Sequence, residues 1–399
     1  MGLSPPGETY NEVGIGTPLL NGPTEFGDAS PLVTLYTTEP HRLSVAGDIL
    51  FCVRGSTTGR MNWSDREYAI GRGVAAIRAR DGADTRYLRA CIDFQLPSLL
   101  QRAGGSTFPN LSFRDLATFE VPLPPLRTQR KIAAILSAYD DLIGNNNRRI
   151  KLLEEVAQRI YREWFVDFRY PGHEVVPLVD SNLGRIPQGW SVCHLEDAAN
   201  VMRGLSWERD QEVASGGLPI ITIPNIQERL HLDGMTRLEG INDSNVRKFS
   251  LAYGDTVLVG SNGNPERVGQ AVSVPRGAEV LFASFLMRVR PDQSLIGAAL
   301  LHMQLKDPRL TRTWRASAVG STSLRNIRLS TLRASPVLLP EAGVHARGEE
   351  QLRQILDLQD ATEKQSVSLH TTRDLLLPHL ISGEIDVTDL NIAAPDIAA

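Results

Sequence analysis

The sequence of 399 residues has the composition of an ordinary globular protein, with 42% hydrophobic residues, 22% charged residues and a net charge of −4. This length allows two or three domains, each with a core of its own. No apolar run approaches the roughly 18–20 residues of a membrane-spanning helix, which excludes an integral membrane protein. Three isolated cysteines without a CxxC pair, and eight histidines without an HxxxH pair, give no support to a disulfide framework or a zinc site.

Residues 1–125 are predicted to form a first domain of short strands and turns. Its clearest strand is the apolar run 48–53, which is followed by the small polar loop 54–59. Such a loop lets the backbone come close to a ligand. It is not a Walker phosphate-binding loop, because no lysine in the chain follows a glycine.

A long helix is predicted over residues 126–168, after the prolines at 122, 124 and 125. Apolar side chains recur from Ile132 at alternating steps of four and three, the spacing of a coiled-coil seam, and only Asn146 interrupts them with an amide. A polar residue in a seam typically fixes register or partner. A local bend at 144–147 is the competing interpretation of this segment.

The rest of the chain repeats this order. A linker rich in Pro and Gly covers 169–188, a second domain is expected over 189–342, a second and weaker helical seam covers 347–380, and 381–399 forms a tail. Gly2-Leu3-Ser4 recurs as Gly204-Leu205-Ser206, and Gly47-Asp48 recurs as Gly254-Asp255. Because a period near 200 residues is far longer than a solenoid repeat, the pattern predicts a duplicated domain and two similar sites.

The second copy has a segment that the first copy lacks. Residues 189–195, Gly-Trp-Ser-Val-Cys-His-Leu, are predicted to form the first strand of the second domain, whereas only Met1 precedes the first Gly-Leu-Ser. We therefore expect the first domain to lack its N-terminal strand. Either the chain begins upstream of Met1 or the strand has been lost.

Arginine dominates the basic residues, with 37 Arg against five Lys, and residues 301–340 hold seven basic groups against one acid. The guanidinium group suits bidentate contacts to phosphates and guanine edges, although codon usage alone explains such a bias equally well. The polar loops that recur in both halves, together with nearby Arg, Thr and Asn residues, are therefore the candidate DNA contacts. Taken singly, each loop has an alternative interpretation as an ordinary turn between two strands of a hairpin. The candidates are Arg54, Ser56, Thr57, Thr58, Arg60, Thr107 and Asn110 in the first domain, and Asn262, Asn264, Arg267, Arg315, Thr322, Arg325 and Asn326 in the second.

Several motifs resemble those of a known family. The stretches 122–133 (PLPPLRTQRKIA), 164–168 (WFVDF), 171–174 (PGHE) and 186–190 (IPQGW) are similar to the central conserved region of type I restriction–modification specificity subunits. The stretch 377–386 (LPHLISGEID) resembles the closing motif of the same family.

The resemblance implies an α/β fold, in which two similar target-recognition domains of mixed strands and short helices are separated by two long antiparallel coiled-coil helices. It also implies a cytoplasmic, non-catalytic subunit that binds a bipartite, asymmetric site on double-stranded DNA. Methyltransferase subunits and restriction–translocase subunits would be its partners, and would carry S-adenosylmethionine, ATP and Mg.

Three alternatives remain beside this interpretation. The chain could be a methyltransferase itself, but it has neither an Asn-Pro-Pro-aromatic motif nor a Gly-rich fingerprint after a strand. It could be a coiled-coil adaptor without a nucleic-acid ligand, as the net charge of −4 would allow. It could also recognise DNA for another phage-defence methylation system.

Overall fold

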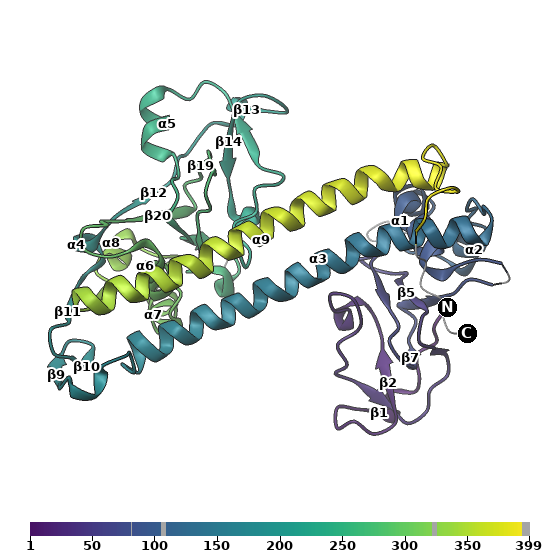
Figure 1. Ribbon diagram of the computed structural model, residues 1–399, viewed down its shortest axis with the longest axis horizontal. Helices are drawn as coiled ribbons and strands as arrows, with labels where there is room; N and C mark the ends of the chain where they lie inside the picture. The colour runs from purple at the N-terminus through teal and green to yellow at the C-terminus, as the bar shows by residue number, and fades with distance from the viewer. Residues whose placement is uncertain (81, 105–108, 321–324, 393–399) are drawn as a thin grey trace. The chain divides into compact units, whose positions relative to one another are not determined.

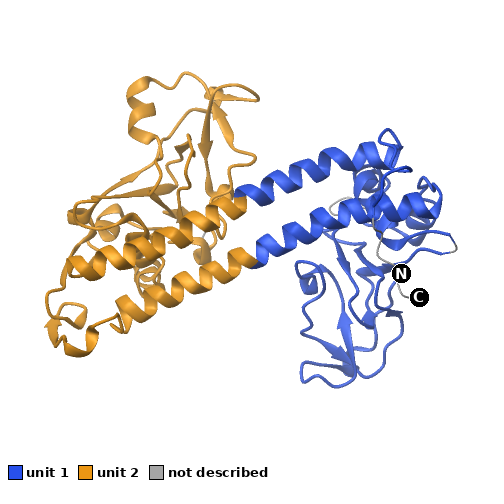
Figure 2. Ribbon diagram, viewed as in Figure 1, with its two compact units in different colours: residues 1–148, 364–399 blue, residues 149–363 orange. Residues whose placement is uncertain are grey.

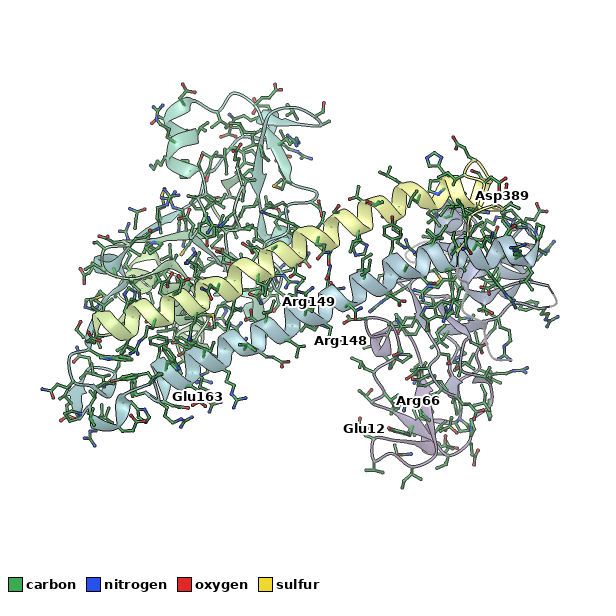
Figure 3. All side chains as sticks on the ribbon, in the orientation of Figure 1. Glu12, Arg66, Arg148, Arg149, Glu163 and Asp389 are labelled. Atoms are coloured by element: carbon green, nitrogen blue, oxygen red, sulfur yellow. The ribbon has the colours of Figure 1, made fainter. Side chains whose placement is uncertain are left out.

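The computed structural model describes residues 1–80, 82–104, 109–320 and 325–392 (Figure 1). The chain divides into two compact units, residues 1–148 with 364–399 and residues 149–363 (Figure 2). Arg148 and Arg149, both labelled in Figure 3, are the helical neighbours between which the chain passes from the first unit to the second.

Among its described residues, the second unit contains two four-stranded sheets, three two-stranded ones and several short helices. One sheet has the antiparallel order β12-β20-β16-β18, and the other has the order β13-β15-β14-β19, in which β14 and β19 run parallel. The first strand of this domain, β11, pairs with the last, β22. The elements are β9 (Leu178–Ser181), β10 (Gly184–Pro187), β11 (Ser191–His194), α4 (Leu195–Ala198), β12 (Ala199–Arg203), β13 (Glu212–Val213), β14 (Leu218–Ile221), β15 (Thr236–Leu238), α5 (Asp243–Phe249), β16 (Thr256–Val259), β17 (Ser261–Asn262), β18 (Ala271–Ser273), β19 (Leu281–Phe282), β20 (Leu286–Pro291), α6 (Ala298–Leu305), α7 (Pro308–Ser317), β21 (Arg325–Asn326), α8 (Leu329–Arg333) and β22 (Pro336–Leu339).

The first unit repeats this plan in a smaller form. One sheet has the order β6-β5-β8, and the other has the order β1-β3-β2-β7-β4. The amide of Gly2 donates to the Val74 carbonyl, as the amide of Gly204 donates to the Leu286 carbonyl, so the two repeats align here. The elements are β1 (Tyr10–Asn11), β2 (Thr17–Leu20), β3 (Tyr36–Thr37), β4 (Leu43–Ser44), β5 (Ile49–Cys52), β6 (Met61–Trp63), β7 (Tyr68–Ile70), β8 (Val74–Ile77), α1 (Thr85–Gln101) and α2 (Phe113–Ala117).

The Gly-Asp repeat makes the same tight turn before each central strand. Gly47 and Gly254 both have a positive φ, 89° and 88°, which favours glycine. The carboxylate of Asp48 accepts the Val45 amide and pairs with Arg78 at 2.7 Å. Asp255 does the same with the Ala252 amide and with Arg290, also at 2.7 Å. The motif is therefore structural, and it fixes where β5 and β16 begin.

Two long helices, α3 (Leu126–Tyr161) and α9 (Ala342–Ser382), contribute to both units. Within each unit they pack antiparallel: Asp140 contacts Arg373 in the first unit, and Ile150 contacts Gln359 in the second. No seam position predicted for α3 from Ile132 to Trp164 is exposed, and the buried ones include Ile132, Leu136, Ile143, Asn146, Ile150 and Ala157. The predicted antiparallel helical pair is confirmed.

Some boundaries differ from those expected. The second long helix begins at Ala342, before the expected residue 347, because the Glu341 carboxylate accepts the amides of Gly343 and Val344 in its first turn. Helix α3 ends at Tyr161 and continues as a π-helical turn, Arg162–Val166. It runs unbroken through 144–147, so no helix end lies there. The expected linker 169–188 holds the hairpin β9–β10.

In the second unit β12 covers one side of β20, the strand equivalent to β8. In the described part of the first unit, β8 pairs with β5.

Candidate nucleic-acid interface

In each unit, the polar loop after the central strand pairs with a second segment that lies about 55 to 65 residues further along the chain. In the first unit Arg54 bridges to Asn110, which also exchanges two backbone hydrogen bonds with Gly104. In the second unit β17 pairs with β21, so that Ser261 lies opposite Asn326 and Asn262 lies opposite Arg325. The structure therefore assembles, in both units, residues that the sequence analysis had grouped only by recurrence.

Hydroxyl and amide side chains hold these loops in shape. Thr58 donates to the carbonyls of Gly55 and Pro109, which ties the loop to the second segment. The side-chain oxygen of Asn262 accepts the Asn264 amide, and that of Asn264 accepts the Glu266 amide. Ser56 and Thr57 are exposed. Thr107 and Thr322 lie outside the described residues.

Two of the candidate arginines have a structural role that the sequence did not reveal. Arg60 donates to the carbonyls of Pro23 and Phe26, at 3.2 and 2.8 Å, and so holds a 3-10 turn. Arg267 donates to the carbonyls of Ile223 and Ile226 around the equivalent turn of the second unit. Because both guanidinium groups make the same two bonds, we assign them to the shape of the domain, and a base contact by either residue stays a prediction.

Other candidates in the second unit are engaged in the same way. Arg315 donates to the carbonyls of Val268 and Glu266. The side-chain oxygen of Asn326 accepts Arg203 at 2.6 Å and the Ser261 hydroxyl at 2.9 Å. Burial lowers the pKa of Arg203. Arg325 is exposed beside this cluster.

Arg54 stands apart from the arginines that bind carbonyls or amide oxygens of their own domain, because it lines an open hollow of about 640 Å³ in the first unit. Arg72, which the sequence analysis missed, lines the same hollow, and both residues are exposed. Sequence alone could have drawn attention to Arg72 only through an alignment of the two repeats, in which Arg72 takes the position of Ser284. Since Arg54 aligns with Ser261, this region carries two arginines in one unit and two serines in the other. The other lining residues are Ser4, Pro5, Gly7, Tyr10, Asn21 and Gly73.

Neither a metal centre nor a membrane segment is found in the part of the chain that the structure describes. No group of three or more His, Cys, Asp and Glu side chains among these residues could hold a metal ion. None of the described helices is long and apolar enough to cross a membrane.

Comparisons with known proteins point to one family. Residues 36–155 match the family model for the type I restriction modification DNA specificity domain. A putative type I restriction enzyme specificity subunit from Methanocaldococcus jannaschii, MjaX, is 35% identical over 161 residues, which are 40% of this chain and 38% of the relative. The MjaIX specificity subunit of the same organism is 24% identical over 360 residues, which cover 88% of this chain and 80% of the relative.

The same fold occurs in a solved structure. The crystal structure of the type I restriction–modification S subunit from M. genitalium matches with a TM-score of 0.60 and 16% identity, over 95% of this chain and 92% of that chain. At this identity the match concerns the fold alone. It is the α/β architecture of two domains and two long helices that the sequence resemblance implied.

Proposed function

The chain belongs to the family of type I restriction–modification specificity subunits, and from this membership we propose that it recognises a bipartite, asymmetric site on double-stranded DNA. One half-site would be read by each unit. The observation that carries the proposal is the paired loop segment, Arg54 with Asn110 and Ser261 with Asn326, which recurs in both units. Because exposed side chains differ between the two copies, the two half-sites should differ in sequence.

We further propose that the chain is non-catalytic and acts in the cytoplasm within a larger complex. Methyltransferase subunits would supply S-adenosylmethionine chemistry, and restriction–translocase subunits would supply ATP- and Mg-dependent cleavage. Three apolar side chains of α3 are exposed and would be available to a partner: Leu142 in the first unit, and Leu152 and Val156 in the second.

A salt titration of DNA binding tests the proposal. The purified full-length chain should bind duplex DNA with a log–log salt slope of several units, because each neutralised phosphate contributes about −0.9. In cells that also carry the partner subunits, sequencing of methylated positions should give one split motif. A coiled-coil adaptor without a nucleic-acid ligand would not bind duplex DNA and would leave the methylation pattern of the cells unchanged, and either result would refute the proposal.

A further inference from the structure

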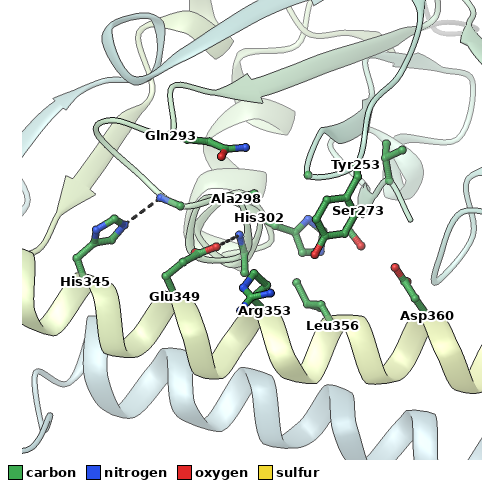
Figure 4. Close-up of a pocket in the computed structure, with 14 residues that line it drawn as sticks. Tyr253, Ser273, Gln293, Ala298, His302, His345, Glu349, Arg353, Leu356 and Asp360 are labelled. Atoms are coloured by element: carbon green, nitrogen blue, oxygen red, sulfur yellow. Dashed lines mark hydrogen bonds between the residues drawn. The ribbon is translucent and has the colours of Figure 1, made fainter. Parts of the chain in front are cut away.

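In the second unit, the long helix α9 caps the N-terminus of the domain helix α6 (Figure 4). The Glu349 carboxylate accepts the amides of Ala299 and Leu300 at 3.1 and 2.8 Å. Nε2 of His345 accepts the amide of Gly297 at 2.9 Å. These amides have no partner within α6 itself, since the first amides of a helix lack intrahelical acceptors. Two side chains of α9 therefore satisfy the end of a helix that belongs to the recognition domain.

Gly297 leaves room for this arrangement. It occupies the N-cap position of α6, where a side-chain acceptor is usual, and it has none. A Cβ atom built on Gly297 would lie 2.1 Å from Cδ of Glu349. The backbone of Gly297 has a φ of −70°, which any residue can adopt, so the glycine matters here for the space that the Glu349 carboxylate fills.

In the first unit, the carboxylate that caps the domain helix belongs to the N-cap residue of that helix. Asp84, the N-cap of α1, accepts the amides of Arg86 and Tyr87 itself, at 2.9 and 3.0 Å. Gln129 of α3, the counterpart of Glu349, accepts the Asp84 amide at 2.9 Å and donates to the carbonyls of Gly82 and Pro124. Gln129 is fully buried. In both units a side chain of a long helix is thus bound to the start of the domain helix.

A second attachment joins each domain helix to the other long helix. In the second unit Lys306, directly after α6, pairs with Glu154 of α3 at 2.5 Å. In the first unit Asp93 of α1 pairs with Arg373 of α9 at 2.9 Å. The basic residue of the ion pair lies next to the domain helix in the second unit and on the long helix in the first. The long helix that forms this ion pair is α3 in the second unit and α9 in the first. Each domain helix is therefore held at two points, one on each long helix.

We propose that Gln129 and Glu349 are equivalent positioning residues, which fix the orientation of each recognition domain on the long helices and thereby aim its DNA-reading loop. This inference rests on the proposed DNA-binding function. It assigns Glu349 to the half-site of the second unit and Gln129 to that of the first. A residue that only caps α6 could belong to any element, whereas a residue that positions the domain must belong to a long helix. A variant that is capped from α6 itself therefore separates capping from positioning.

The test measures two properties of the full-length chain and its variants. Hydrogen exchange of the Ala299 and Leu300 amides reports the cap. Affinity for two DNA duplexes reports positioning. Both duplexes derive from the split site that is methylated in cells. One keeps the sequence of the first half-site and has a scrambled second half-site, and the other keeps the second and has a scrambled first. Glu349→Ala should lose amide protection and should bind the duplex that keeps the second unit's half-site several-fold more weakly, because the domain is no longer fixed on α9. The other duplex should bind unchanged.

A double variant and a conservative single variant then separate the cap from the attachment. Gly297→Asp with Glu349→Ala supplies a carboxylate from α6 itself, so amide protection should return while half-site affinity stays low. Glu349→Gln alone keeps the length of the side chain and one acceptor oxygen without colliding with residue 297, and should lose less of both properties than Glu349→Ala. Glu350→Ala, on the neighbouring exposed position, is the matched control and should change neither.

Two outcomes would overturn the inference. Wild-type affinity in the Gly297→Asp, Glu349→Ala variant would reduce Glu349 to a helix cap. An equal loss on both duplexes in Glu349→Ala would show a general effect on the chain. If the wild-type chain bound neither duplex, the proposed function itself would fail. The exchange data would still report the helix cap, because that measurement needs no DNA.

Discussion

Arginine is the most informative residue of this chain, because its side chains separate into two groups. Arg60, Arg267 and Arg315 donate to backbone carbonyls of their own domain. Arg54 and Arg72 instead line an open hollow. All of these residues look alike in the sequence, so residue type could not distinguish a guanidinium that shapes a loop from one that faces solvent. The distinction comes from backbone carbonyls that lie far away in the sequence, at 23–26 for Arg60, 223–226 for Arg267 and 266–268 for Arg315.

Arg54→Ala is therefore expected to weaken DNA binding without unfolding the chain. A bidentate contact to a base edge would cost about 1–3 kcal/mol and relax specificity in the half-site of the first unit only, whereas a phosphate contact would weaken binding to all sequences and reduce the salt slope by about one. Affinity measured across salt concentrations distinguishes these cases. Arg60→Ala is the matched control from the same loop, and should lower the melting temperature instead. Unchanged affinity and unchanged salt slope in Arg54→Ala would remove this residue from the interface.

At the scale of elements, the long helices were the most predictable part of the fold. Their seams repeat over many turns, and positions such as Ile132, Ile150 and Leu352 are buried as the spacing required. The attachment of domains to helices was not predictable. Glu349 looks like a surface residue in a charged run, and its role depends on the amides of Ala299 and Leu300, some 50 residues away in the sequence.

The ion pair of Lys306 with Glu154, together with the neighbouring His302, predicts that the second unit loses stability in acid. His302 of α6 is buried, and burial followed by the charge of Lys306 lowers its pKa from 6.5 to about 3. Burial would raise the pKa of Glu154, but the charge and hydrogen bond of Lys306 outweigh it and lower the pKa from 4.5 to about 2. The unfolded chain thus takes up protons at these two groups before the folded unit does. The stability that they contribute is complete above about pH 6.5, and falls as the pH drops toward 3 and then 2.

Replacing His302 isolates its part of this dependence. Between about pH 4 and 6, the free energy of unfolding of the wild type should change by roughly 1.4 kcal/mol per pH unit more than that of His302→Gln, since one proton is linked to unfolding. Denaturant unfolding of the full chain at several pH values measures both slopes. The equivalent position in the first unit is Arg89, which does not titrate in this range. Equal slopes in wild type and variant would show that His302 is protonated in the folded unit.

At the scale of the whole molecule, the duplication was visible in the sequence, and its consequence is that two recognition domains share one pair of helices. The exact alignment of the repeats was not visible, because loop insertions move the offset from 202 at Gly2 to 220 at Ile135. Hydrogen bonds supply it: those of Gly2 and Gly204, and those around Asp48 and Asp255, are made at equivalent places. Sequence therefore predicted two similar sites, and structure was needed to show that their exposed residues differ.

If the helix pair sets the gap between half-sites, lengthening both helices should change that gap and nothing else. Four residues inserted after Gly144 in α3, and four after Gln365 in α9, add about 6 Å and rotate the helix by about 40°. Such an insertion unwinds a seam locally but keeps its apolar positions facing inward. The tolerated gap should grow by about one or two base pairs, at 3.4 Å each.

Sequencing of methylated positions in cells that carry the partner subunits measures the gap and both half-site sequences together. An insertion in α3 alone is the control, because it shifts one seam against the other and should abolish methylation rather than change the motif. Altered half-site sequences with an unchanged gap would show that the helices do not set the spacing, and recognition of a split site by two units on one helical pair would have to be abandoned.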